Sequence, residues 1–178
     1  NAASGYNRPI LEQKPKGWQW TLDINARSAL FGAQYAVPLM RKRGGGHIVN
    51  ITSMGSQFVL PDYAVVGASK AALETITRYM AVELAPHDIA VNAVSPGMVA
   101  TEALTHFRQL QPKLDATMRH VHEGTPAGRM VVPEDVAGTV AFLCSPEAAM
   151  IRGQVIIVDG GFTLGFGMAH AAPPAKVE

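Results

Sequence analysis

The chain alternates between two patterns of hydrophobic and polar positions. Long segments place apolar side chains three and four residues apart, as on one face of a helix, whereas short segments are apolar throughout. Helices are therefore expected at residues 18–40, 63–85 and 133–143, with an irregular, polar helical segment at 101–123. Buried strands are expected at residues 47–51, 89–94 and 155–158. Continuously apolar strands that alternate with helices predict an α/β fold, a doubly wound parallel sheet covered on both faces.

Polar or glycine-rich residues follow each predicted strand. Thr52-Ser53 follows the first strand, Ser95-Pro96-Gly97 follows the second, and Asp159-Gly160-Gly161 follows the third. In a doubly wound sheet, ligands bind outside the carboxyl ends of the strands. These three turns are therefore the expected place for a site.

Composition narrows the classes of protein. The 178 residues are 48% apolar and 16% charged, which excludes a disordered chain and allows a sizeable core. A formal charge of +1 predicts no nucleic-acid partner, and the lack of a long apolar run predicts no membrane partner. The single cysteine, Cys144, indicates a reducing compartment and hence a cytoplasmic location. No metal site is expected, because the sequence has neither paired cysteines nor a His-Glu-x-x-His motif.

Tyr63 and Lys70 are the first candidates for chemistry. They stand seven residues apart, and seven residues turn a helix by about 700°, so both side chains share one face about 10 Å apart along the axis. A phenol and an ammonium so placed can bracket a ribose. Lys70 would then bind the ribose hydroxyls and lower the pKa of the phenol, leaving Tyr63 as a proton donor. Without further motifs, the same pair fits two residues at the surface or at the edge of the core.

Further motifs surround this pair in a fixed order. They are Asn1-Ala2-Ala3, Asn25 within Leu22-Asp23-Ile24-Asn25, the strand and turn at 48–53, Ala68-Ser69-Lys70-Ala71-Ala72-Leu73, the strand and turn at 91–97, and Gly153-Gln154 with Val158-Asp159-Gly160-Gly161. Together they resemble the short-chain dehydrogenase/reductase family, from Asn1 to about Phe166. The resemblance implies a Rossmann-type fold and a nicotinamide cofactor.

The resemblance also implies roles for individual residues. Ser53 would hydrogen-bond the substrate carbonyl, and Asn25 would either organise a water linking Lys70 to solvent or pack the helix. The expected catalytic residues are Tyr63, Lys70, Ser53 and Asn25. The expected cofactor-binding residues are Asn1, Tyr63, Lys70, Pro96, Gly97 and Thr101. Pro96-Gly97 is at the same time a turn that ends a strand.

One departure from the common family pattern is informative. That pattern places the catalytic tyrosine four residues before the lysine, where this chain has Val66. The longer Tyr63–Lys70 spacing resembles the enoyl-acyl-carrier-protein reductase branch, and with the other motifs its NADPH-dependent type III. This implies reduction of an enoyl thioester, carried on acyl carrier protein or CoA, in fatty acid biosynthesis. The alternatives are a carbonyl reductase or alcohol dehydrogenase of the same family, and a non-catalytic remnant.

A second departure concerns the family's glycine-rich pyrophosphate turn, which does not occur in this sequence. Residues 1–166 are therefore expected to be the C-terminal part of a single reductase domain, and residues 167–178 a disordered tail. The resemblance further implies a homotetramer or homodimer.

Overall fold

Three parallel strands form the centre of the protein in the computed structural model, which describes residues 3–5, 7–101 and 114–165. The strands are β1 (Gly46–Ile51), β2 (Ile89–Pro96) and β3 (Val155–Val158), in the order β1-β2-β3. All three predicted strands and their parallel arrangement are confirmed. β2 extends two residues beyond its predicted end, because Ser95 and Pro96 still pair with β3.

Helices lie before, between and after the strands. Their bounds are α1 (Pro15–Leu22), the π-helical turn η2 (Asp23–Arg27), α2 (Ser28–Arg41), α3 (Ala64–Glu83), α5 (Leu114–Gly124) and α6 (Pro133–Leu143). Short 3₁₀ turns occur at η1 (Ile10–Glu12), η3 (Met54–Ser56), η4 (Ala85–His87) and η5 (Pro146–Ala148). The predicted helix at 18–40 starts three residues earlier, because Pro15 occupies a first-turn position, and η2 divides it.

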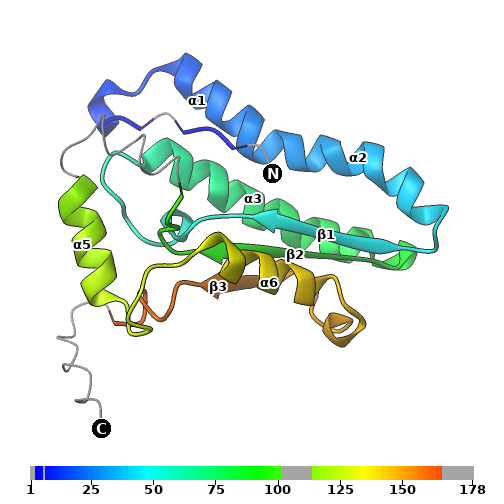
Figure 1. Ribbon diagram of the computed structural model, residues 1–178. Coiled ribbons are helices and arrows are strands. Elements are labelled where there is room, and N and C mark those ends of the chain that lie inside the picture. Colours follow the sequence, from blue (N-terminus) through cyan, green and yellow to red (C-terminus); the bar gives the residue numbers. More distant parts are fainter. Residues whose placement is uncertain (1–2, 6, 102–113, 166–178) are drawn as a thin grey trace, which may run out of the picture.

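The helices cover both faces of the sheet (Figure 1). α2 and α3 lie on one face and α6 lies on the other. Ile89 and Val91 of β2 pack against Ala33, Met80 and Ala81 from α2 and α3. On the opposite face Val94 packs with Leu143 and Ala148. β2 is therefore buried on both sides, which explains its continuously apolar sequence.

The carboxyl ends of the strands meet at one edge of the sheet, on the side where α5 lies (Figure 1). The backbone N–H of Thr52 donates to the carbonyl of Val94 at 2.8 Å, and that of Gly97 donates to Val158 at 2.9 Å. The three turns that follow the strands are thus held side by side, as expected for a site at this edge.

Some expectations concern residues outside the described ranges. These are Asn1, the tail at 167–178, and most of the predicted segment at 101–123, of which α5 is the described part. Within the described residues, no helix has the length and apolar character needed to cross a membrane.

Candidate active site

Ser53 and Tyr63 are brought together at the carboxyl end of β1. Ser53 has extended backbone angles and caps the turn η3, where its Oγ accepts from the N–H of Gly55 at 3.3 Å. Tyr63 stands immediately before α3 as its N-cap residue. The hydroxyl oxygens of Ser53 and Tyr63 lie 3.3 Å apart. Two hydroxyl groups are therefore aimed at the same point, as residues that bind one substrate oxygen must be.

Two glycines allow this close approach. A Cβ on Gly55 would lie 2.5 Å from ring carbons of Tyr63, and a Cβ on Gly67 would overlap the carbonyl oxygen of Gly55. Neither position has room for a side chain. The small residues at the start of α3 thus let the turn η3 rest directly on the helix.

Lys70 lies within α3 and points back to the end of β1. Its Nζ donates to the carbonyl of Ile51 at 2.8 Å, and only 7% of its surface is exposed. Burial disfavours the charged ammonium and lowers the pKa of Lys70 below its ordinary value. An ammonium carries three protons, so donors remain beyond the one that Ile51 accepts.

The pKa of Tyr63 moves in the opposite direction from the sequence-based expectation. Burial raises it above its ordinary value, and the hydrogen bond with Ser53 only partly opposes this. The expectation of a lowered pKa is therefore wrong for this structure: desolvation raises the pKa, and the group that opposes the rise is Ser53 rather than Lys70. The phenol is protonated at neutral pH, as a proton donor must be.

Asn25 lies in the π-helical turn η2 and is 4% exposed. Its Nδ2 donates to the carbonyl of Ser4 at 2.8 Å and to Ser69 Oγ at 2.9 Å, and its Oδ1 accepts from the N–H of Ser4 at 2.8 Å. Asn25 therefore ties the N-terminal segment to α3 next to Lys70. Of the two roles expected for it, these contacts favour the packing role.

Two of the remaining expected cofactor-binding residues, Pro96 and Gly97, lie along the same edge of the sheet. Pro96 ends β2, and a Cβ on Gly97 would lie 3.0 Å from Cβ of Asp159. Gly97 is therefore required by packing as well as by its place beside the site. Thr101 is exposed, at the end of a described range, and Asn1 lies outside those ranges.

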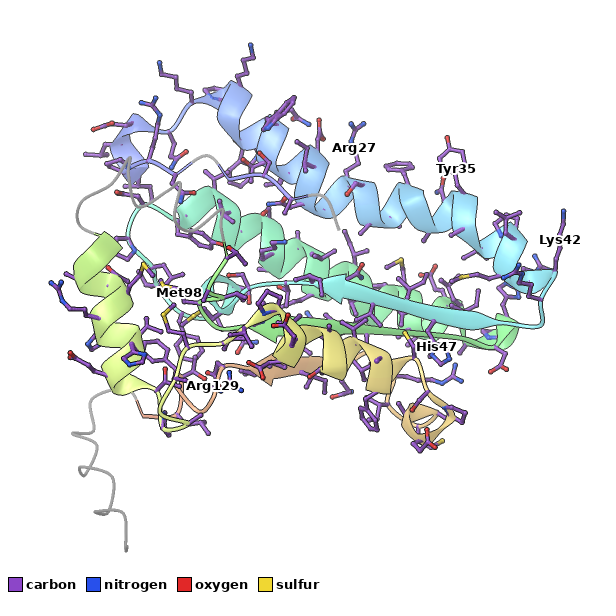
Figure 2. All side chains as sticks on the ribbon, viewed as in Figure 1. Arg27, Tyr35, Lys42, His47, Met98 and Arg129 are labelled. Carbon is purple, nitrogen blue, oxygen red and sulfur yellow. The ribbon has the colours of Figure 1, made fainter. Side chains whose placement is uncertain are left out.

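An apolar cluster adjoins Ser53. Met54, Val121 and Phe162 are its buried members, with Phe58, Leu60, Met98 and Met130 packed against them. Figure 2 shows Met98 between the strand ends and α5. Met54, the residue after Ser53, thus joins the turn that carries Ser53 to apolar side chains from α5 and from the turn after β3.

The sequence reasoning missed Glu74, which contacts the turn that carries Ser53. Thr52 Oγ1 donates to Glu74 Oε1 at 2.8 Å, and Ser56 Oγ is also a donor to that oxygen. A signal was present, since Glu74 follows Lys70 by four residues and so shares its helix face. Among the small and apolar residues of that face, a carboxyl group needs hydrogen-bond donors.

Comparison with known proteins identifies the family. A family model described as enoyl-(acyl carrier protein) reductase matches residues 1–163. The chain belongs to the short-chain dehydrogenase/reductase family. Among curated relatives, it is 38% identical over 174 residues to 1-cyclohexenylcarbonyl-CoA reductase from Streptomyces collinus, covering 98% of this chain. The chain spans 59% of the length of that relative.

Solved structures of the family share the fold. An acetoin dehydrogenase from Salmonella typhimurium matches with a TM-score of 0.76 and 34% identity, over 98% of this chain and 64% of that one. A gluconate 5-dehydrogenase from Burkholderia cenocepacia, in complex with NADP and tartrate, matches with a TM-score of 0.83 and 29% identity. That match covers 92% of this chain and 63% of the other.

The donor set of this short-chain dehydrogenase/reductase fits the NAD(P) cofactor of the family. A nicotinamide ribose presents adjacent hydroxyl groups, which require donors and acceptors placed together. Lys70 offers ammonium protons beyond the one given to Ile51, and Tyr63 offers a phenol at the N-cap of the same helix. Both lie beside the strand ends where a doubly wound sheet binds a nucleotide.

Proposed function

We propose that this short-chain dehydrogenase/reductase reduces the carbon–carbon double bond of an enoyl thioester with NADPH, in the cytoplasm. We further propose that the reaction belongs to fatty acid synthesis on acyl carrier protein, with CoA thioesters as the alternative substrates. Similarity to a reductase named for a CoA thioester supports the substrate class. Similarity to a structure in complex with NADP supports the choice of NADPH.

The observation that carries the proposal is the position of the tyrosine. Position 66, four residues before Lys70, holds a valine that is 4% exposed and packs inside the protein. The phenol comes instead from Tyr63, whose hydroxyl reaches Ser53. This seven-residue spacing resembles the enoyl reductase branch rather than the common ketoreductase pattern.

The roles of the residues follow from their chemistry. Lys70 and Tyr63 would hold the nicotinamide ribose, and the bound cofactor would supply a hydride for the β-carbon of the substrate, so that negative charge would develop on the thioester oxygen. Tyr63, a phenol that burial keeps in its protonated form to still higher pH, donates a hydrogen bond or its proton to that oxygen. Ser53 shares the binding of that oxygen, and Lys70 holds the ribose.

The apolar cluster beside Ser53 supports an acyl substrate. Its partly buried members, Phe58, Leu60, Met98 and Met130, can still offer hydrocarbon and thioether surface on the side of the turn that carries Ser53. Contact with such surface favours an acyl chain by about 25 cal/mol per Å² removed from water. We assign α5, which supplies Val121, to the wall or lid over that chain.

A carbonyl reductase or alcohol dehydrogenase is the second candidate. The similar acetoin and gluconate dehydrogenases, by their names, act on hydroxyl or carbonyl carbons. The same Ser53–Tyr63 pair can protonate an alkoxide as readily as it stabilises an enolate. The arrangement of the Ser53 and Tyr63 hydroxyl groups is therefore compatible with both reactions.

A substrate pair separates the two candidates. The complete gene product is mixed with NADPH and either crotonyl thioester or acetoacetyl thioester, each on CoA and on acyl carrier protein, and absorbance at 340 nm is followed. Faster oxidation with crotonyl thioester supports enoyl reduction. Oxidation with acetoacetyl thioester alone supports the carbonyl reductase, and oxidation with neither supports a non-catalytic protein.

A further inference from the structure

Glu74 is a buried carboxyl group that the proposed chemistry does not use. It lies on α3 one turn after Lys70, with 5% of its surface exposed. Within the part of the chain that the structure describes, no salt bridge joins it to a cation. Removing a carboxyl group from water costs free energy unless hydrogen bonds replace those of water. Its hydrogen-bond partners therefore indicate why a carboxyl group stands at this position.

Both partners are hydroxyl groups of one turn. Thr52 Oγ1 donates to Glu74 Oε1 at 2.8 Å, and Ser56 Oγ donates to the same oxygen. Ser56 Oγ also lies 2.8 Å from the carbonyl oxygen of Ser53, so its single proton is shared between two acceptors. Glu74 thus holds the residue before Ser53 and the residue three positions after it.

The backbone alone does not fix Ser53 this closely. Its neighbours are held by the N–H of Thr52, which donates to Val94, and by the N–H of Ser56, which donates to the carbonyl of Ser53 itself. The second of these bonds lies within the turn and moves with it. On the β1 side, Lys70 of α3 also contacts Ile51 through its Nζ and Thr52 Oγ1 through its carbonyl at 3.5 Å. The bonds to Glu74 join both sides of the turn to the rigid helix α3.

We propose that Glu74 is a positioning residue that sets the place of Ser53 Oγ relative to Tyr63 OH. This inference rests on the proposed function in that Ser53 and Tyr63 bind the same substrate oxygen. Loss of the two bonds lets the turn shift against α3, while Lys70 keeps its own bond to Ile51. A displacement of about 1 Å at a reacting group can cost about 10²-fold in rate.

Two substitutions of similar size test the role of the acceptor oxygen. Glu74→Gln keeps a carbonyl oxygen that accepts from both hydroxyls, whereas Glu74→Leu removes every acceptor. In the complete gene product, Glu74→Gln should keep kcat within about threefold of wild type. Glu74→Leu should lower kcat by about 10- to 10²-fold with the KM for the cofactor unchanged. Equal losses in both variants, or a loss confined to KM, would overturn the proposal.

A double-mutant cycle tests whether Glu74 acts through Ser53. Once Ser53→Ala has removed the hydroxyl, adding Glu74→Leu should lower kcat by less than about twofold more. A residue that only supports the fold would lower kcat by the same factor in both backgrounds. That result would contradict a positioning role.

Hydrogen exchange gives a readout that needs no activity and no assigned substrate. The amides of residues 55–57 donate within the turn η3, so their exchange reports how firmly the turn is held. We expect about tenfold faster exchange there in Glu74→Leu and wild-type exchange in Glu74→Gln. Thr52→Val removes one donor with little change of shape, and it replaces Glu74→Leu should that variant fail to fold.

The two proposals fail in different ways. A wild-type protein that reduces neither thioester contradicts the proposed function, whereas the exchange measurement still tests Glu74. Unchanged exchange of residues 55–57 in both Glu74→Leu and Thr52→Val would overturn the role of Glu74, whatever substrate the protein reduces.

Discussion

The hydroxyl oxygens of Ser53 and Tyr63 lie 3.3 Å apart, although ten residues separate the two in the chain. The intervening segment leaves β1, forms η3 and returns to the start of α3, so that a strand end and a helix start present their side chains to one point. This pair is the centre of the proposed chemistry. Lys70 lies at the same strand end, where its Nζ donates to the carbonyl of Ile51.

Removing the phenol should abolish most of the activity. Tyr63→Phe in the complete gene product should lower kcat for crotonyl thioester reduction by about 10²-fold or more, because only the less acidic hydroxyl of Ser53 then faces the thioester oxygen. Steady-state kinetics at 340 nm measure this. Adding Val66→Tyr should not restore the rate, since Val66 points into the core rather than toward Ser53. A Tyr63→Phe rate within a few-fold of wild type would remove Tyr63 from the mechanism.

Burial of Tyr63 should make stability depend on pH above its ordinary pKa. The folded pKa is raised from 10.0, so the stability that the protonated phenol contributes is complete below pH 10. It is lost as the pH rises from 10 through the folded pKa, because the unfolded phenol ionises first. Urea unfolding between pH 9 and about 11 should therefore show wild type losing stability relative to Tyr63→Phe. Parallel curves would show that the phenol is not buried.

Lys70 should show the opposite dependence. Its pKa is lowered from 10.5 by burial, so below the folded pKa the cost of burying the ammonium is complete. As the pH rises through the folded pKa toward 10.5, wild type should gain stability relative to Lys70→Met. The same urea titrations measure both effects, and their opposite slopes distinguish them from general alkaline unfolding. A flat difference between wild type and Lys70→Met would place the ammonium in water.

The contact between η3 and α3 should be sensitive to a single methyl group. Gly67→Ala should destabilise the protein by about 1–3 kcal/mol and lower its activity, because its Cβ meets the backbone of Gly55. Gly138→Ala on α6 is the matched control. Apart from its chain neighbours and its own helix backbone, no atom of the described residues lies within 4 Å of the added Cβ, so alanine should stabilise the helix by about 0.5–1 kcal/mol. Thermal unfolding of both variants measures the contrast, and equal effects would refute the close contact.

Exposed apolar residues on α2 and α3 predict self-association. Tyr35 on α2 is 81% exposed and points away from the sheet (Figure 2), and Val82 on α3 is 75% exposed. Apolar surface of this kind on helices marks a contact between subunits. The complete gene product should sediment as a dimer or tetramer at micromolar concentration. Tyr35→Asp with Val82→Asp should weaken that assembly, whereas Lys42→Glu at the end of α2 should not. A monomeric wild type would contradict the prediction.

Much of the fold is predictable from hydrophobic spacing. The three strands and α6 stand where continuous apolar runs and the first-turn Pro133 place them. The division of the first long helix by η2 was not predictable, because the residues of this π-helical turn, Asp23–Arg27, form no distinct sequence pattern.

The sequence was sufficient to select the main residues of the candidate site but not to predict the direction in which the pKa of Tyr63 shifts. Motif order identified Ser53, Tyr63 and Lys70, and the structure places all three at the end of β1. The direction of the pKa shift of Tyr63 depends on burial by residues distant in sequence, which spacing along one helix does not reveal. Glu74 was missed for a similar reason, since its partners Thr52 and Ser56 lie some twenty residues earlier in the chain.

The identity of the reduced product shows whether the protein reduces an enoyl double bond or a carbonyl group. Crotonyl thioester is incubated with the complete gene product and NADPH carrying deuterium at the nicotinamide C4, and the product is analysed by mass spectrometry and NMR. The account predicts a butyryl thioester with one deuterium on the β-carbon, and no such product from Tyr63→Phe over the same time. Recovery of unchanged crotonyl thioester, from a preparation that reduces acetoacetyl thioester to the hydroxyacyl product, would contradict it.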